Sequence, residues 1–160
     1  MTAPSEYGPL FRDAYAALHG GRTDDAPADS GRRPDESLEE YLARSRGEAL
    51  GRLRARLEAG EPPPELRAAH ELLVRLLAAA VEADAALAAQ VEAYRCGNFQ
   101  GSIGHSDRLH AIVAESARLD RDLILALREA EEANAGTLDA LGIAAVPEPP
   151  IAAEDAEDWV

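Results

Sequence analysis

Residues 66–94 read LRAAHELLVRLLAAAVEADAALAAQVEAY. At intervals of three and four residues this stretch carries Leu66, His70, Leu73, Leu77, Ala80, Asp84, Leu87, Val91 and Tyr94. Side chains at this spacing share one face of an α-helix and are typical of the seam in an antiparallel hairpin or coiled coil. Gly60 ends the preceding segment and Pro62-Pro63-Pro64 favours a new start, so we predict one helix over residues 64–95.

The same spacing returns later in the chain and predicts another long helix over residues 107–135. Its inward positions are Leu109, Ile112, Ser116, Leu119, Leu123, Ala126 and Ala130. Both apolar faces are too wide for two helices to cover each other. We therefore predict an all-α fold, in which a long antiparallel helical hairpin turns near residue 100. One or two further helices complete it into a three- to four-helix bundle.

Composition favours the same fold class. The 160 residues include 34 Ala and 20 Leu, two residue types of high helix propensity. Aromatic residues make up only 4% of the chain, whereas strands favour aromatic and β-branched side chains. Helices are therefore expected throughout the folded part.

A helix over residues 37–59 opens with the capping-box pattern of Ser37 and Glu40. Its apolar stripe consists of Leu42, Leu50, Leu53 and Leu57, and beside it runs a row of small residues: Ala43, Gly47, Gly51 and Ala55. Small side chains let a neighbouring helix approach closely, and we predict such packing here. The alternative is a weak, frayed helix. The arginines of this segment scatter around the helix, which argues against a basic docking face.

The remaining segments differ in composition from the bundle. We predict a short N-terminal helix in residues 1–19, a flexible linker in 20–36, the helical bundle in 37–142 and a disordered acidic tail in 143–160. The segment TLDALG, which follows Gly136, is expected to add one short turn. The tail ends on Trp159 and Val160, either a linear motif that a partner protein reads or an arbitrary chain end.

Charge argues against two classes of partner. The chain carries 30 acidic and 16 basic residues, a net charge of −14. Such a surface repels phosphate backbones and anionic lipids, so we expect neither nucleic-acid nor membrane binding. The apolar run at residues 72–91 is interrupted by charged side chains and is not a membrane span. A single cysteine, and an N-terminus without the pattern of a secretory signal, favour a cytoplasmic protein.

Rare, chemically capable side chains gather between the two long helices, in residues 96–110 (CGNFQGSIGHSDRLH). Interpreted as a helix–helix corner, this segment offers a contact or ligand surface made of Cys96, Asn98, Phe99, Ile103, His105 and His110. With Asp107, its thiol and imidazoles are ligand types that zinc accepts. However, His105 and His110 diverge by about 140° if both lie on a helix, and Asp107 is well placed to cap that helix. We predict no metal site and no cofactor.

Enzymatic chemistry finds little support. Cys96 follows a helix C-terminus, whose dipole disfavours a thiolate, so we expect a packed and unreactive thiol. The sequence contains no Glu-x-x-His or His-x-x-x-His pair, no phosphate-binding glycine loop and no Ser/His/Asp arrangement. We therefore predict that the protein is not an enzyme.

Two polar side chains, His70 and Asp84, interrupt the apolar face of the long helix. They lie about 21 Å apart along the helix and so belong to different places in the bundle. If the hairpin turns near residue 100, His70 faces Glu131, and Asp84 faces Ser116, Arg118 and Arg121. Pairing of this kind would fix the register of the helices. The alternative for Asp84 is a ligand pocket shared with an arginine.

These features favour a non-enzymatic helical protein that acts through association with proteins, as an adaptor or a small structural or regulatory subunit. The partner is an unknown protein, and a homodimer is one form that the association can take. The alternative is a sensor bundle that binds a small molecule or a metal near Asp84 or near residues 96–110.

Overall fold

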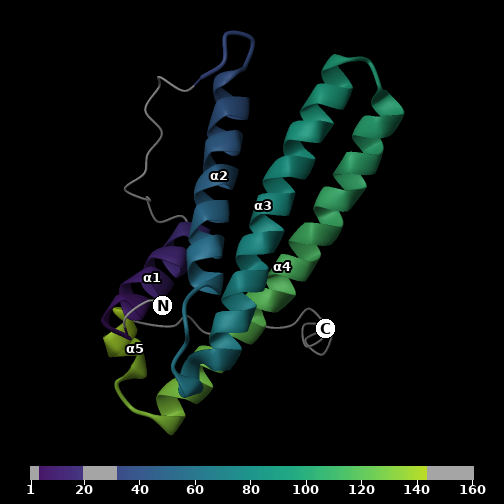
Figure 1. Cartoon of the computed structure of the whole chain (residues 1–160). Coiled ribbons are helices and arrows are strands. Elements are labelled where there is room, and N and C mark those ends of the chain that lie inside the picture. The colour runs from purple at the N-terminus through teal and green to yellow at the C-terminus, as the bar shows by residue number, and fades with distance from the viewer. Residues whose placement is uncertain (1–3, 20–31, 144–160) are drawn as a thin grey trace, which may run out of the picture.

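The computed structural model describes residues 4–19 and 32–143, and this part of the chain is all-α (Figure 1). In chain order its elements are α1 (Pro4–Leu18), α2 (Leu38–Glu58), the 3₁₀ helix η2 (Pro64–Leu66), α3 (Arg67–Arg95), α4 (Phe99–Ala133) and α5 (Thr137–Leu141). α3 and α4 form a long antiparallel hairpin, and α2 packs along α3. α1 packs against α2, α3 and α5 at the end away from the hairpin turn. The predicted fold class is confirmed.

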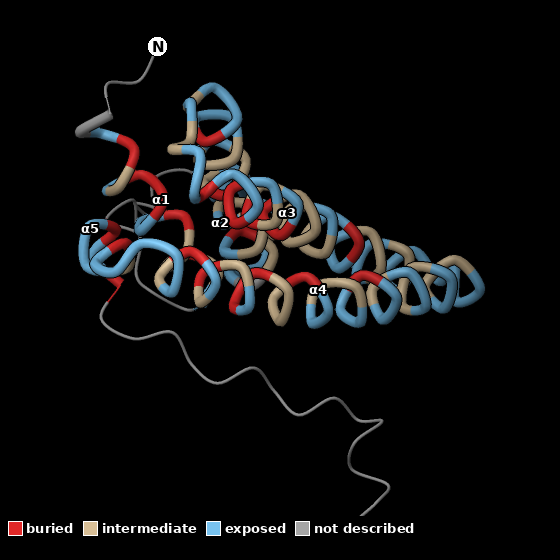
Figure 2. Tube along the Cα trace, turned by 90° about the horizontal axis from the view of Figure 1, so that it is seen from below, coloured by how far each residue is buried: buried red, intermediate tan, exposed pale blue. Residues whose placement is uncertain are grey.

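Most of the core lies at that same end of the hairpin. We call residues 67–80 of α3 and 116–133 of α4 the proximal half of the hairpin, and residues 81–115 the distal half. Fully buried leucines in the proximal half include Leu73, Leu77, Leu123 and Leu127. Toward the turn the tube in Figure 2 changes from buried to mostly exposed. The hairpin is therefore covered on several sides only along its proximal half.

α1 supplies much of that cover. Tyr7, Leu10, Phe11 and Ala14 recur at three- and four-residue spacing, and all four are buried in the core. At the C-terminal end of α1, the ring of His19 hydrogen-bonds the Asp120 carboxylate of α4, at 2.9 Å. The N-terminal helix is thus an integral part of the bundle.

The turn between α3 and α4 is much shorter than expected. Only Cys96, Gly97 and Asn98 separate the two helices, and Gly97 takes a left-handed conformation with φ +73°. Asn98 caps α4 by accepting a hydrogen bond from the Gly101 amide at 2.9 Å. The predictions that α4 begins at residue 107 and that Asp107 caps it are therefore wrong. Gly101 and Gly104, which belong to the segment predicted to be a helix–helix corner, lie inside the helix that Asn98 caps.

The early start of α4 also shifts the pairing of the two helices. Arg75 pairs with Glu115 at 3.2 Å, and Glu82 pairs with Arg108. A turn centred on residue 100 would place residue 118 opposite Glu82, but Arg108 lies there instead. Each residue of α3 therefore lies opposite a residue closer to the start of α4 than predicted. The residues of α4 that lie level with His70 and Asp84 are likewise closer to the start of α4 than predicted.

α2 begins with the predicted capping box. Ser37 Oγ accepts from the Glu40 amide at 3.2 Å, and Glu40 Oε2 accepts from the Ser37 amide at 2.7 Å. A Cβ built on Gly47 would lie 3.7 Å from Cβ of Asp84, which is the close packing predicted for the small residues. Gly51 has no such neighbour within 4 Å, so the close approach is confined to one end of the row. Leu42, predicted to face inward, is exposed.

Near the C-terminus the expected short turn is α5, which ends in the buried Leu141 and is followed by the buried Ile143. Of the predicted linker, residues 32–36 lie within the described part of the chain, and residues 20–31 lie outside it. Most of the predicted tail, including Trp159 and Val160, also lies outside the described residues. Among the residues described, no helix is long and apolar enough to cross a membrane.

Candidate functional site

The segment from Cys96 to His110 does not form the corner predicted for it. Most of it is the first part of α4, and the Cys96 side chain is exposed, contrary to the expectation of a packed thiol. Cys96 Sγ donates a hydrogen bond to Glu92 Oε1 at 3.2 Å. This hydrogen bond and the Glu92 charge raise the pKa of Cys96, so the group stays a thiol, which is a poor nucleophile.

The histidines of the segment do not form a metal site with Cys96. His105 and His110 both lie in α4, where five residues separate them around the helix by about 140°. Within residues 4–19 and 32–143, no group of three or more His, Cys, Asp or Glu side chains is placed to hold a metal ion.

What the hairpin turn does present is apolar surface. Tyr94, Phe99 and Ile103 are 67%, 60% and 56% exposed, and the Tyr94 and Phe99 rings meet edge to face with centroids 5.6 Å apart. Val91 and Leu87, one and two turns before Tyr94 on α3, are exposed as well. We call these five residues the distal apolar stripe. Its three α3 residues continue the row in which Leu73 and Leu77 are fully buried.

His70 finds its partner in α1, so the predicted pairing with Glu131 is wrong. The Tyr7 hydroxyl and His70 Nδ1 lie 3.0 Å apart in a buried contact. Burial lowers the pKa of His70 and raises that of Tyr7 well above its usual value, so both groups are neutral near pH 7. Glu131 instead accepts hydrogen bonds from the amides of Gly136 and Leu138, which fastens α5. The pair therefore serves to dock α1.

A charged groove of about 530 Å³ lies between α2 and α3. Six acidic side chains and three arginines line it, a net charge of −3, together with small apolar side chains such as Ala43, Ala85 and Ala88. Residues that precede α2 form part of its wall.

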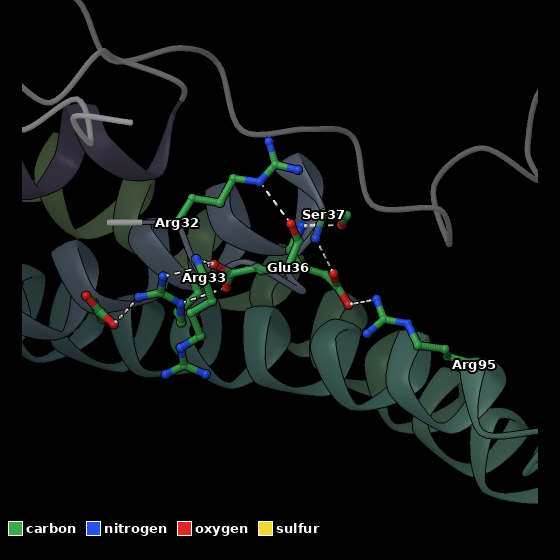
Figure 3. A network of polar contacts seen from close by, with 8 residues as sticks. Arg32, Arg33, Glu36, Ser37 and Arg95 are labelled. Carbon is green, nitrogen blue, oxygen red and sulfur yellow. Dashed lines mark hydrogen bonds and ion pairs between the residues drawn. The ribbon is translucent and has the colours of Figure 1, made fainter. Parts of the chain in front are cut away.

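Ion pairs hold the rim of this groove (Figure 3). Arg44 donates two hydrogen bonds to Glu36, at 2.8 and 3.1 Å, and these bonds lower the pKa of Glu36 to about 2. The Ser37 amide and Arg95 both donate to Glu40 and lower its pKa to about 2 as well. Both carboxylates are therefore ionised and engaged at neutral pH.

Asp84 also lines the groove, but its carboxylate differs from those of Glu36 and Glu40 in its hydrogen bonding and in the direction of its pKa shift. Its side chain is only 12% exposed, and Oδ2 is buried without a hydrogen-bond partner among the described residues. The nearest cation is Arg46 of α2, whose Nη1 lies 3.6 Å from Oδ1, too far for a hydrogen bond. Burial raises the pKa of Asp84, and Arg46 partly opposes that effect. The predicted partners on α4 are thus wrong, and the arginine comes from α2.

Sequence reasoning singled out Asp84 but missed the rest of the groove. Glu36 was assigned to a linker, and Arg44 and Arg95 were considered only as members of helical segments. The capping box at Ser37 and Glu40 was the one available signal, because it fixes where α2 begins beside Arg95.

Comparisons with known proteins add no assignment. No family model matches the chain, and the searches of curated proteins and of solved structures found no match either.

Proposed function

We propose that this chain is a non-enzymatic protein that works through protein association, and that the distal apolar stripe is its contact surface. One observation carries the proposal: a single row of side chains on α3 is buried at Leu73 and Leu77 and exposed at Leu87, Val91 and Tyr94. Exposed apolar side chains in a connected patch mark interaction sites more often than scattered ones do. The single cysteine is compatible with action in a reducing compartment such as the cytoplasm.

The partner that we propose first is a second copy of the chain. Every copy carries the same stripe, so two hairpins can pack in a symmetric contact in which each buries the other's stripe. The contact would continue the packing that the proximal half already makes with α1. Because each chain has a net charge of −14, the copies repel each other, and salt should strengthen their association.

Size-exclusion chromatography with light scattering tests this proposal. We expect a mass that rises with concentration toward twice the chain's 17.0 kDa, and more strongly when NaCl is raised from about 0.05 to about 0.5 M. The triple variant L87S/V91S/Y94S should stay a monomer. Leu125→Ser is the matched control, since Leu125 is also exposed but lies in the proximal half.

The outcomes separate cleanly. A monomer at every concentration and salt, or a dimer that the triple variant leaves intact, would overturn the proposal. A dimer that weakens with salt would also contradict it, because a contact between ion pairs and not between apolar stripes would then be responsible.

A further inference from the structure

We propose that α1 is a releasable cover: protonation of His70 detaches α1 from the bundle and exposes the buried continuation of the distal apolar stripe. The release of α1 stands on its own, whereas its effect on the stripe rests on the association proposed above.

The first argument is what α1 covers. It contributes buried side chains such as Phe11 to the hydrophobic cluster that contains Leu73 and Leu77 of α3. Figure 2 shows α1 beside the part of the bundle in which buried segments gather. Leu73 and Leu77 belong to the row that Leu87 and Val91 continue toward the turn. Detachment of α1 would therefore join newly exposed leucines to the distal apolar stripe in one row along α3.

The second argument is that α1 has little helical stability of its own. Gly8 and Pro9 lie inside it, and Pro9 lacks the amide that would donate to the carbonyl of Ser5. Isolated helices of about 15 residues are marginal in water even when their sequences favour helix. Gly8 also lets α1 approach α5, because a Cβ there would lie 3.1 Å from the carbonyl oxygen of Ala140. α1 is therefore helical because it is docked, and it should lose docking and helix together.

The third argument is the place of His70 in this interface. The Tyr7 hydroxyl of α1 lies 3.0 Å from His70 Nδ1 in a buried contact. Burial lowers the pKa of His70, and Glu58 of α2 and Glu71 of α3, which attract the charged ring, oppose this effect only in part. Glu58 is itself paired with Arg54 at 2.9 Å. Docking therefore favours the neutral ring, and detachment of α1 lets the ring bind a proton.

A second polar contact of α1 involves the other histidine of this interface. The ring of His19 hydrogen-bonds the Asp120 carboxylate of α4 at 2.9 Å. Protonated His19 carries the charge opposite to that of Asp120, so binding of a proton to His19 does not weaken this contact. His70 is therefore the histidine through which a proton releases α1, and His19 supplies the matched control.

Hydrogen exchange of the full chain, at a concentration where it is monomeric, tests the release. At pH 7 the amides of residues 10–18 should be at least about tenfold less protected than those of residues 70–80, because α1 opens without the hairpin. From pH 7 to pH 5 the protection of residues 10–18, corrected for the intrinsic exchange rate, should fall by about three- to 25-fold. The ordinary pKa of 6.5, which His70 regains when α1 is detached, sets the upper limit.

Variants assign the effect to one ring. The His70→Gln side chain can accept from the Tyr7 hydroxyl but does not titrate, so the fall should be less than about twofold. His19→Gln should keep the fall. An NMR titration of the wild-type chain needs no variant and should show that His70 titrates below 6.5. Equal protection of the two segments at pH 7, a fall that persists in His70→Gln, or a His70 pKa at or above 6.5 would overturn the proposal.

The effect on the distal apolar stripe is measured separately, by light scattering at pH 7 and pH 5. Acid should strengthen the dimer at least about threefold more in the wild-type chain than in His70→Gln, because the longer contact forms only when α1 is detached. The carboxylates that titrate over this range are the same in both proteins, so their effect cancels in the comparison. Equal strengthening would overturn the link to the stripe. If neither protein dimerises, the proposed function and this link both fail, whereas the exchange data still decide whether His70 releases α1.

Discussion

The proximal and distal halves of the hairpin are built from the same two helices and the same heptad-like spacing, yet only one of them is a core. Leu77 is fully buried, whereas Leu87, ten residues later in the same row, is 36% exposed. The difference comes from α1, which packs beside the proximal half and supplies Phe11 and its neighbours to the cluster. Helical spacing thus decides which side chains share a face, and the other elements decide whether that face is covered.

The sharpest test of this comparison is the pair Leu77→Ala and Leu87→Ala. Leu77→Ala removes the same atoms from a closed core and should lower the free energy of unfolding by roughly 2–5 kcal/mol. Leu87→Ala should cost less than about 1 kcal/mol, since much of that side chain already meets water. Urea denaturation at low protein concentration, where the proposed dimer is dissociated, measures both values.

Equal losses would contradict the division into two halves. Leu87 would then be as well packed as Leu77 in the monomer, contrary to its exposure of 36%.

The contact that docks α1 on the proximal half gives the next largest effect. Tyr7→Phe leaves buried His70 Nδ1 without its partner and should cost about 1–3 kcal/mol. A parallel hydrogen-exchange measurement should show the loss concentrated in the amides of α1. Tyr94→Phe, which removes an exposed hydroxyl from the distal half, serves as the control and should be nearly neutral.

His70 also makes the proximal half sensitive to acid. Burial lowers its pKa below the unfolded value of 6.5, so the folded state binds this proton more weakly than the unfolded state does. The stability is therefore complete above pH 6.5 and is lost as pH falls through the folded pKa. Urea midpoints should fall between about pH 7 and about pH 5, and His70→Gln should flatten that slope.

The low pKa values of Glu36 and Glu40 act in a different window. Both are lowered from 4.5 to about 2, so their contribution is lost only as pH falls below 4.5. A slope between pH 7 and 5 that persists in His70→Gln would assign the acid sensitivity to some other group.

The positions of most helices could be predicted from the sequence, but the side-chain partners between helices could not. The spacing of leucines predicted α3 over its whole length, and the capping box predicted the start of α2, because both signals are local. The start of α4 was missed because Asn98 outweighs the two glycines that follow it, and that error displaced the expected partners of Asp84. The partner of His70 could not be read at all, since Tyr7 lies 63 positions away in the chain.

The cap at Asn98 is a fourth test, and it concerns the distal half alone. Asn98→Ala removes the acceptor for the Gly101 amide and should cost about 1 kcal/mol. Asn98→Asp keeps an acceptor and should be nearly neutral. Because packing contributes little here, the loss should appear mainly as faster amide exchange in the first turns of α4. If the amides of the proximal half lost as much protection from hydrogen exchange as those in the first turns of α4, the two halves would unfold as one unit.

The last comparison concerns two glycines of the distal half, where backbone conformation and not packing decides the sign of the change in stability. A Cβ on Gly97 or on Gly104 would meet no atom within 4 Å, so neither substitution is blocked by a neighbour. Gly104 lies inside α4, and Gly104→Ala should stabilise the protein by about 0.5–1 kcal/mol. Gly97 has φ +73°, which costs an L-residue roughly 1–2 kcal/mol, so Gly97→Ala should destabilise it. Urea denaturation of the two variants side by side gives the signs, and stabilisation by both would mean that the turn does not require a left-handed residue.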